Sequence, residues 1–345
     1  MLPMSELRTV EWANGRVRMI DQTRIPYKFR YVTFKDYKQV AKAIRDMVVR
    51  GAPAIGVAAA MGLALAANSS RAATKQQLIK ELEAAADVLR RSRPTAWNLF
   101  WAIDRILRKA QAGGGGPSDI AAQVVNEALR MAEEDVEANR KIGEYGAELL
   151  EDGDCVLTHC NTGTLATVSY GTALAPIRTA VTQGKKIRVI ATETRPRLQG
   201  AKLTTYELLR DRIPVTLIVD GAVGYVMRKG LVKKAIVGAD RITARFVANK
   251  VGTYLVALAA QANQIPFYVA APSSTFDLRQ DHTEVNIEER NPQEVTHIGG
   301  KRIVPKGVKV FNPAFDLTPV DLVRGFITEK GVVAADRLRA GLFGA

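Results

Sequence analysis

The sequence is poor in cysteine and histidine, and these shortages exclude several classes of protein. Its 345 residues include only two cysteines and three histidines, too few for a disulfide framework. Neither cysteine belongs to a CxxC pair and the histidines are scattered, so we expect no metal site. So few cysteines are typical of a reducing compartment, and we expect a cytoplasmic protein.

A secretion signal and a membrane-spanning run are also missing. The N-terminus lacks a basic region followed by an apolar core. The most apolar stretch, residues 52–67, is interrupted by Gly56 and Gly62 and is shorter than the roughly 18 residues that cross a bilayer. The sequence therefore predicts no membrane segment.

Acidic residues are outnumbered, with 35 Asp and Glu against 49 Lys and Arg, for a formal net charge of +14. A basic balance favours anionic partners such as nucleic acid, phosphorylated metabolites or a membrane surface. The basic residues are dispersed along the chain and form no dense block interleaved with aromatic residues. We therefore do not expect a nucleic-acid partner.

The first 117 residues predict a small antiparallel sheet followed by helices. Residues 10–34 alternate polar and apolar side chains, and Asn14-Gly15 is a strong hairpin signal. Pro53 favours the first turn of a helix directly after the junction Arg50-Gly51. That junction offers an anion a guanidinium, free backbone N–H groups and a helix N-terminus, although a plain corner between two helices is an alternative explanation.

Four glycines, residues 113–116, form the clearest break in the pattern and are followed by Pro117-Ser118. We predict an N-terminal domain over residues 1–117 and a catalytic domain over residues 118–345. A long helix, residues 118–150, is expected to bridge the two.

Beyond residue 154, short apolar runs alternate with helical segments. The runs cover residues 155–159, 187–191, 215–219, 235–237, 267–270 and 308–311. Apolar strands separated by helices predict a Rossmann-like α/β fold, with a parallel sheet covered on both faces. Ligands of such sheets bind beyond the carboxyl ends of the strands. No GxGxxG motif is present, so no dinucleotide cofactor is expected.

Cys160 and Asp240 follow two different predicted strands. A thiol in a turn that enters a helix can have its pKa lowered by the helix N-terminus and by nearby cations. A carboxyl group in a dry cleft has a raised pKa and can act as an acid. The two are suited to proton transfer on one substrate, although buried cysteines are usually inert and aspartates at strand ends often cap helices. His159 would point to the opposite face of its strand, so we do not expect a Cys–His couple.

Several segments, taken together, resemble the methylthioribose-1-phosphate isomerase family over nearly the whole chain. The segments are Arg50–Gly56, Arg93–Ala96, Thr158–Asn161, Glu193–Ala201, Gly238–Ile242, Ala248–Thr253, Ile287–Pro292 and Asn312–Asp316. Related groups share the fold and parts of these motifs: archaeal ribose-1,5-bisphosphate isomerases and the regulatory subunits of the translation-initiation guanine-exchange factor.

The resemblance implies an aldose–ketose isomerase of methionine salvage that converts 5-methylthioribose 1-phosphate to 5-methylthioribulose 1-phosphate. Cys160 and Asp240 match the family's catalytic pair. The positions that match its substrate-binding residues are Arg50, Gly51, Ala52, Arg93, Gln199, Asn249 and Lys250. The resemblance also implies a homodimer and no metal or organic cofactor.

Three departures from the family pattern concern substrate preference. Gly221-Ala222-Val223 and Thr162 replace residues common in the family, and the stretch between Asp240 and Asn249 is one residue shorter. Two alternatives therefore stay open. One is an isomerase of a related sugar phosphate, ribose 1,5-bisphosphate or 5-deoxyribose 1-phosphate. The other is a non-catalytic regulatory subunit.

Overall fold

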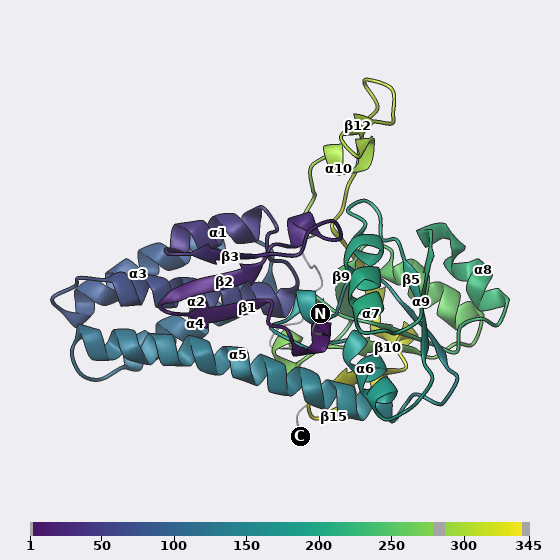
Figure 1. Ribbon diagram of the computed structural model, residues 1–345, viewed down its shortest axis with the longest axis horizontal. Helices are drawn as coiled ribbons and strands as arrows, with labels where there is room; N and C mark the ends of the chain where they lie inside the picture. The colour runs from purple at the N-terminus through teal and green to yellow at the C-terminus, as the bar shows by residue number, and fades with distance from the viewer. Residues whose placement is uncertain (1–2, 279–286, 340–345) are drawn as a thin grey trace.

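The computed structural model describes residues 3–278 and 287–339. Figure 1 shows an elongated N-terminal region of helices beside a C-terminal region built on a large sheet, with one long helix running along both. The fold class confirms the prediction of an α/β protein with a mainly helical N-terminal region.

A small antiparallel sheet opens the chain, in the order β1 (Val10–Ala13), β2 (Arg16–Ile20) and β3 (Tyr31–Phe34). The turn between β1 and β2 has positive φ at Asn14 (51°) and Gly15 (70°). Two such residues form the two-residue turn that matches the twist of a hairpin.

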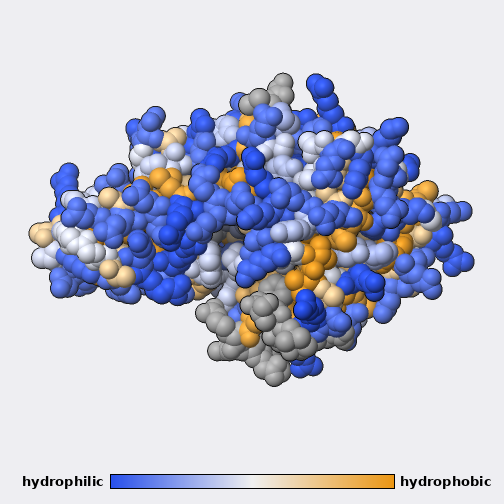
Figure 2. All heavy atoms as spheres, turned by 90° about the horizontal axis from the view of Figure 1, so that it is seen from below, coloured by the Kyte–Doolittle hydropathy of each residue, from blue (hydrophilic) through white to orange (hydrophobic). Residues whose placement is uncertain are grey.

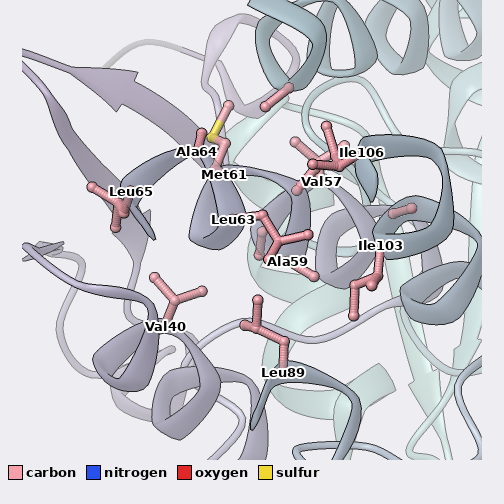
Figure 3. Packing of buried hydrophobic residues seen from close by; sticks show 14 of the residues in the cluster. Val40, Val57, Ala59, Met61, Leu63, Ala64, Leu65, Leu89, Ile103 and Ile106 are labelled. Atoms are coloured by element: carbon pink, nitrogen blue, oxygen red, sulfur yellow. The ribbon is translucent and has the colours of Figure 1, made fainter. Parts of the chain in front are cut away.

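The helix α2 (Ala52–Ser69) lies at the centre of the N-terminal region. It contacts α1 (Tyr37–Arg45), α3 (Lys75–Arg90) and α4 (Trp97–Ala112). Figure 3 shows side chains from these helices pointing toward one another around it, among them Leu63 of α2 and Leu89 of α3. By length and composition α2 could cross a membrane, but 78% of it is buried inside the structure, as in the core helix of a globular protein.

The long helix α5 (Pro117–Ala147) packs on α2 at one end and on α6 (Leu174–Thr182) at the other. Its course, visible along the lower edge of Figure 1, joins the two regions. The predicted helix over residues 118–150 is therefore present, and it ends slightly earlier. The division into domains at residue 117 stays a proposal.

The C-terminal region holds a seven-stranded sheet in the order β15-β14-β10-β7-β4-β5-β6. All neighbouring strands are parallel except β14 and β15. The strands are β4 (Cys155–Thr158), β5 (Arg188–Thr192), β6 (Val215–Ile218), β7 (Lys234–Val237), β10 (Phe267–Ala270), β14 (Gly325–Thr328) and β15 (Gly331–Ala334). From β4 the chain adds β5 and β6 on one side, then returns to place β7 on the other. The direction of winding thus changes between β4 and β7, where ligands bind in doubly wound sheets.

Both faces of the sheet are covered by helices. Successive residues of β4 point into different hydrophobic cores. Val156 packs on the face of the sheet that α6 covers, and Leu157 packs on the opposite face. That opposite layer contains α8 (Val223–Arg228) and α9 (Thr253–Ala262), while α7 (Thr205–Arg210) lies on the side of α6.

One predicted strand is wrong. Residues 308–311 adopt no regular secondary structure, and Phe311 is 78% exposed. The next strand is instead β13 (Phe315–Pro319), which pairs antiparallel with β9 (Phe246–Lys250) in a separate sheet with β8 (Arg241–Ile242). Three apolar residues in a window of four do not determine burial, and here Val308 and Phe311 are both exposed.

Candidate active site

A cavity of about 70 Å³ lies where the sheet changes its direction of winding. All nine residues predicted for the site line it: Arg50, Gly51, Ala52, Arg93, Cys160, Gln199, Asp240, Asn249 and Lys250. They come from the start of α2, the turn before α4, the ends of β4, β7 and β9, and the segment after β5. The folded chain therefore brings together residues that are up to 200 positions apart.

Cys160 has an unusual backbone conformation. Its φ is +64°, in the left-handed region that residues other than glycine rarely adopt. Two buried hydroxyls hold it there. Its N–H donates to Thr194 Oγ1 at 2.9 Å, and its carbonyl accepts from Thr204 Oγ1 at 2.6 Å. Residues held in such conformations cluster at functional sites, and this turn presents the thiol to the cavity.

Burial raises the pKa of the Cys160 thiol, while the charges of Arg50 and Lys250 oppose the rise. The sequence pattern had suggested a lowered pKa, and this expectation is wrong. No long helix begins at the turn, since only a short 3-10 segment, Thr164–Ala166, follows. Desolvation of the thiolate therefore outweighs the nearby cations.

Asp240 follows β7, the strand beside β4. Its N–H donates to the carbonyl of Ala248 at 2.9 Å, which joins it to the strand that carries Asn249 and Lys250. Burial raises its pKa, against the charges of Lys250, Arg93 and Arg50. This direction agrees with the prediction of a carboxyl group that can remain protonated and donate a proton.

Three cationic side chains and a helix N-terminus face the same space. Arg50 donates to the carbonyl of Asn161 at 2.7 Å, Arg93 pairs with Glu288 at 3.0 Å, and Lys250 is largely buried. Gly51 precedes the first turn of α2 with a φ of +93°. The free N–H groups of that turn and the three cations are chemically suited to an anion such as phosphate.

Several polar atoms around the cavity are buried without a hydrogen-bond partner among the described residues. Within the cavity lining they are Arg50 Nη1, Arg93 Nε, Asn161 Oδ1, Thr162 Oγ1 and Gln199 Oε1. Buried polar groups in folded proteins are nearly always bonded, so these five atoms are available to a polar ligand or to water.

Among the lining residues that sequence reasoning did not assign to the site are Met47, Arg197, Arg290 and Phe315. Arg197 and Arg290 lie inside segments that carry the family resemblance, and this was their one available signal. Both are bound to Glu294, at 2.7 and 2.9 Å, so their charges are partly compensated. Phe315 also lies in such a segment, Asn312–Asp316, while Met47 carries no pattern that separates it from a core residue.

A larger cavity of about 600 Å³ lies between α4, α5 and the segment after β10. It contains neither Cys160 nor Asp240. Its lining includes ion-paired charges, such as Arg105 with Glu134, and the carboxyl group of Asp135, whose pKa is raised to about 7 by burial. We place the site in the smaller cavity because the groups able to do chemistry converge there. Within residues 3–278 and 287–339, no three His, Cys, Asp or Glu side chains are grouped as metal ligands.

Comparison with known proteins identifies the family. The sequence profile of the initiation factor 2 subunit family matches residues 48–335. The chain belongs to this family. The methylthioribose-1-phosphate isomerase of Geobacter metallireducens is 53% identical over 332 residues, which are 95% of this chain and 96% of that protein. The predicted family resemblance is thereby confirmed.

Solved structures agree on the fold. The 5-methylthioribose 1-phosphate isomerase of Pyrococcus horikoshii is 45% identical, with a TM-score of 0.90 over 99% of this chain and 96% of that chain. A structure from A. fulgidus described as translation initiation factor eIF-2B, subunit delta, is 51% identical, with a TM-score of 0.85 over 96% of this chain and 97% of that chain. Relatives of similar identity thus carry names from two functional classes.

Proposed function

We propose that this protein is an aldose–ketose isomerase that converts 5-methylthioribose 1-phosphate to 5-methylthioribulose 1-phosphate. The observation that carries the proposal is the meeting of Cys160, Asp240 and the cationic residues around one cavity. The names of relatives about half identical to this chain support the same substrate.

The phosphate lies at the N-terminus of α2, between Arg50, Arg93 and Lys250. Arginines give forked, charge-assisted hydrogen bonds to phosphate oxygens. Arg93 is 9% exposed and Lys250 is also 9% exposed, so their charges act in a setting with little water. Fixed charges and dipoles stabilise a reacting anion more strongly in such a setting.

Asp240 acts as the acid. The anomeric oxygen of the substrate carries phosphate, so the ring opens only when the ring oxygen receives a proton and its bond to C1 breaks. Burial raises the pKa of this carboxyl group, which favours the protonated form that supplies that proton. The C4 hydroxyl is formed, and C1 becomes electron-poor.

Cys160 assists the movement of hydrogen from C2 to C1, by one of two routes. It takes the C2 proton to form an enol phosphate and returns it to C1, or it stabilises a direct shift of hydride from C2 to C1. In both routes the C2 hydroxyl proton passes to the Asp240 carboxylate and C2 becomes the ketone. The raised pKa of Cys160 keeps the thiol protonated, which favours the hydride route because a neutral thiol is a poor base.

The decisive experiment follows conversion of 5-methylthioribose 1-phosphate by NMR. We expect turnover by the wild type, and a loss of at least about 1,000-fold in kcat for Cys160→Ser and for Asp240→Asn. Cys155→Ala is the matched control, because Cys155 is also a buried free cysteine but packs in a hydrophobic core. Full activity in both site variants would refute the mechanism.

Two alternatives are tested with the same preparation. Ribose 1,5-bisphosphate and 5-deoxyribose 1-phosphate are compared with the methylthio substrate by kcat/KM, since specificity is a ratio of those values. A regulatory subunit, the class named for the A. fulgidus relative, would form a stoichiometric complex with a translation factor and turn over none of the three sugars.

The protein is further proposed to act as a homodimer in the cytoplasm. On the face shown in Figure 2, most apolar atoms gather on the side of the C-terminal region. At the sheet edge, β6 exposes Leu217 (48%), and Val219 beyond it is 60% exposed. An exposed apolar edge strand offers unpaired backbone groups to a second chain. Light scattering should report a dimer for the wild type and a monomer for Leu217→Lys.

A further inference from the structure

A chain of hydrogen bonds runs behind the candidate site, from the backbone of Cys160 to the turn after Lys250. Cys160 N–H donates to Thr194 Oγ1 at 2.9 Å, and that hydroxyl lies 3.1 Å from Thr192 Oγ1. Thr192 Oγ1 lies 2.7 Å from His159 Nδ1, and His159 Nε2 lies 2.9 Å from the carbonyl oxygen of Val251. The side chains of His159, Thr192 and Thr194 are at most 1% exposed.

The direction of each bond follows from elementary chemistry. The Val251 carbonyl only accepts, so His159 Nε2 carries a hydrogen. Burial lowers the pKa of His159, so the ring is neutral and Nδ1 accepts from the Thr192 hydroxyl. Thr192 has then used its one hydrogen, so its hydroxyl oxygen can only accept from Thr194, whose own oxygen accepts from Cys160. The Thr194 hydroxyl also has the backbone carbonyl of Thr192 as an acceptor at 3.3 Å, so its hydrogen is shared between the two oxygens of Thr192.

The turn on the far side of His159 fits the ring closely. Gly252 has a φ of +103°, and a Cβ there would lie 2.9 Å from His159 Cε1. From the other side, Asp316 Oδ2 accepts the Gly252 N–H at 2.7 Å. The turn that carries Lys250 is thus clamped between His159 and β13.

We propose that His159 is a positioning residue, which holds the Lys250 turn and the Cys160 backbone at a set separation. It does not line the cavity, so it acts through its two neighbours. The inference rests on the proposed function, because it assigns Lys250 to the phosphate and Cys160 to the reacting carbons. The alternative is a plain buried histidine whose loss lowers stability alone.

Two substitutions separate the two ends of the network. Asn has an oxygen near the position of Nδ1, so His159→Asn keeps the bond to Thr192 and loses the bond to Val251. Gln has an amide nitrogen near the position of Nε2, so His159→Gln keeps the bond to Val251 and loses the acceptor for Thr192. We expect His159→Asn to raise KM about 10-fold with little change in kcat. We expect His159→Gln to lower kcat about 10- to 100-fold with little change in KM, since a displacement of about 1 Å costs up to 100-fold.

Thr192→Val provides an independent test with a side chain of the same shape. It should lower kcat as His159→Gln does. The double variant His159→Gln/Thr192→Val should have a kcat no lower than that of either single variant, because both substitutions break the same chain of hydrogen bonds. Thr158→Val is the matched control. Thr158 precedes His159 on β4 and is fully buried, but its hydroxyl has no partner among the described residues. It should keep wild-type kcat and KM.

The tautomer of His159 is measured by ¹⁵N NMR on the wild type. We expect a hydrogen on Nε2 and none on Nδ1 at pH values above the ordinary pKa of histidine. A hydrogen on Nδ1, equal changes of kcat and KM in both His159 variants, or full additivity with Thr192→Val would each overturn the inference. Absence of turnover by the wild type would instead refute the proposed function, while the tautomer measurement still tests the network.

Discussion

Gly51 is the position where a single methyl group tests the proposed phosphate site. Its φ of +93° and ψ of 137° lie in a region that other residues reach at a cost of about 1 to 3 kcal/mol. A Cβ on this residue would lie 2.4 Å from the carbonyl oxygen of Ala166, and ordinary contacts begin at 3.4 Å. The start of α2 or the backbone at Ala166 must therefore move by about 1 Å (3.4 minus 2.4).

A shift of the start of α2 would displace the N–H groups that we propose to face the phosphate. A misplacement of about 1 Å costs about 100-fold in rate, equivalent to about 2.7 kcal/mol. We therefore expect Gly51→Ala to lower kcat/KM about 100-fold in the NMR assay, and to weaken binding of inorganic phosphate in calorimetry. Stability should fall by about 1 to 3 kcal/mol in denaturant unfolding.

Gly153→Ala is the matched control for this experiment. Gly153 also has a positive φ, +85°, but no heavy atom of the described residues lies within 4 Å of the position that a Cβ would occupy. The variant Gly153→Ala should be less stable than the wild type, because alanine rarely adopts a positive φ, and it should keep full activity. If Gly51→Ala stays within about threefold of Gly153→Ala in kcat/KM, the N-terminus of α2 does not hold the phosphate.

Three further outcomes follow from the charges and chemistry of the structure. The activity should fall as pH rises through the raised pKa of Asp240, because the acid loses its proton. The lowered pKa of Lys250 adds to this fall, because the lysine loses its charge as pH rises. A kcat/KM that keeps rising above about pH 9 would contradict this prediction. The pKa of Asp135 is raised from 3.8 to about 7, so the folded protein retains a proton that the unfolded chain releases between those values, and the unfolding free energy falls as pH rises through that window. Asparagine does not titrate in this range. The unfolding free energy of Asp135→Asn should therefore rise by about 1 to 2 kcal/mol relative to that of the wild type between about pH 5 and pH 8, as measured by denaturant unfolding. Substrate deuterated at C2 should yield product with deuterium at C1 by the hydride route, and wash-out into water would favour the enol route.

Much of the architecture could be predicted from local patterns. Asn14-Gly15 indicated the first hairpin, Pro53 indicated the start of α2, and the apolar runs indicated the strands of the parallel sheet. The placement of Cys160 and Asp240 at one edge followed from the rule that parallel strands end on the same side. The strand predicted at residues 308–311 failed because burial depends on neighbours that a short window does not contain.

The site itself was predicted less completely. The family resemblance supplied positions such as Arg93 and Gln199, which no spacing rule connects to Cys160. The left-handed backbone of Cys160 and its two threonine partners arise from tertiary contacts between residues more than 30 positions apart. The direction of the Cys160 pKa change depends on the balance between burial and charge, which is a property of the folded site alone.

The helix α2 has one end at the candidate phosphate site and its body in the hydrophobic core. An anion bound at Gly51 would therefore stabilise the same eighteen residues that organise the N-terminal region. Ligand occupancy should slow hydrogen exchange of amides deep in α2, far from any contact with substrate. For this helix, ligand binding and folding therefore depend on one segment.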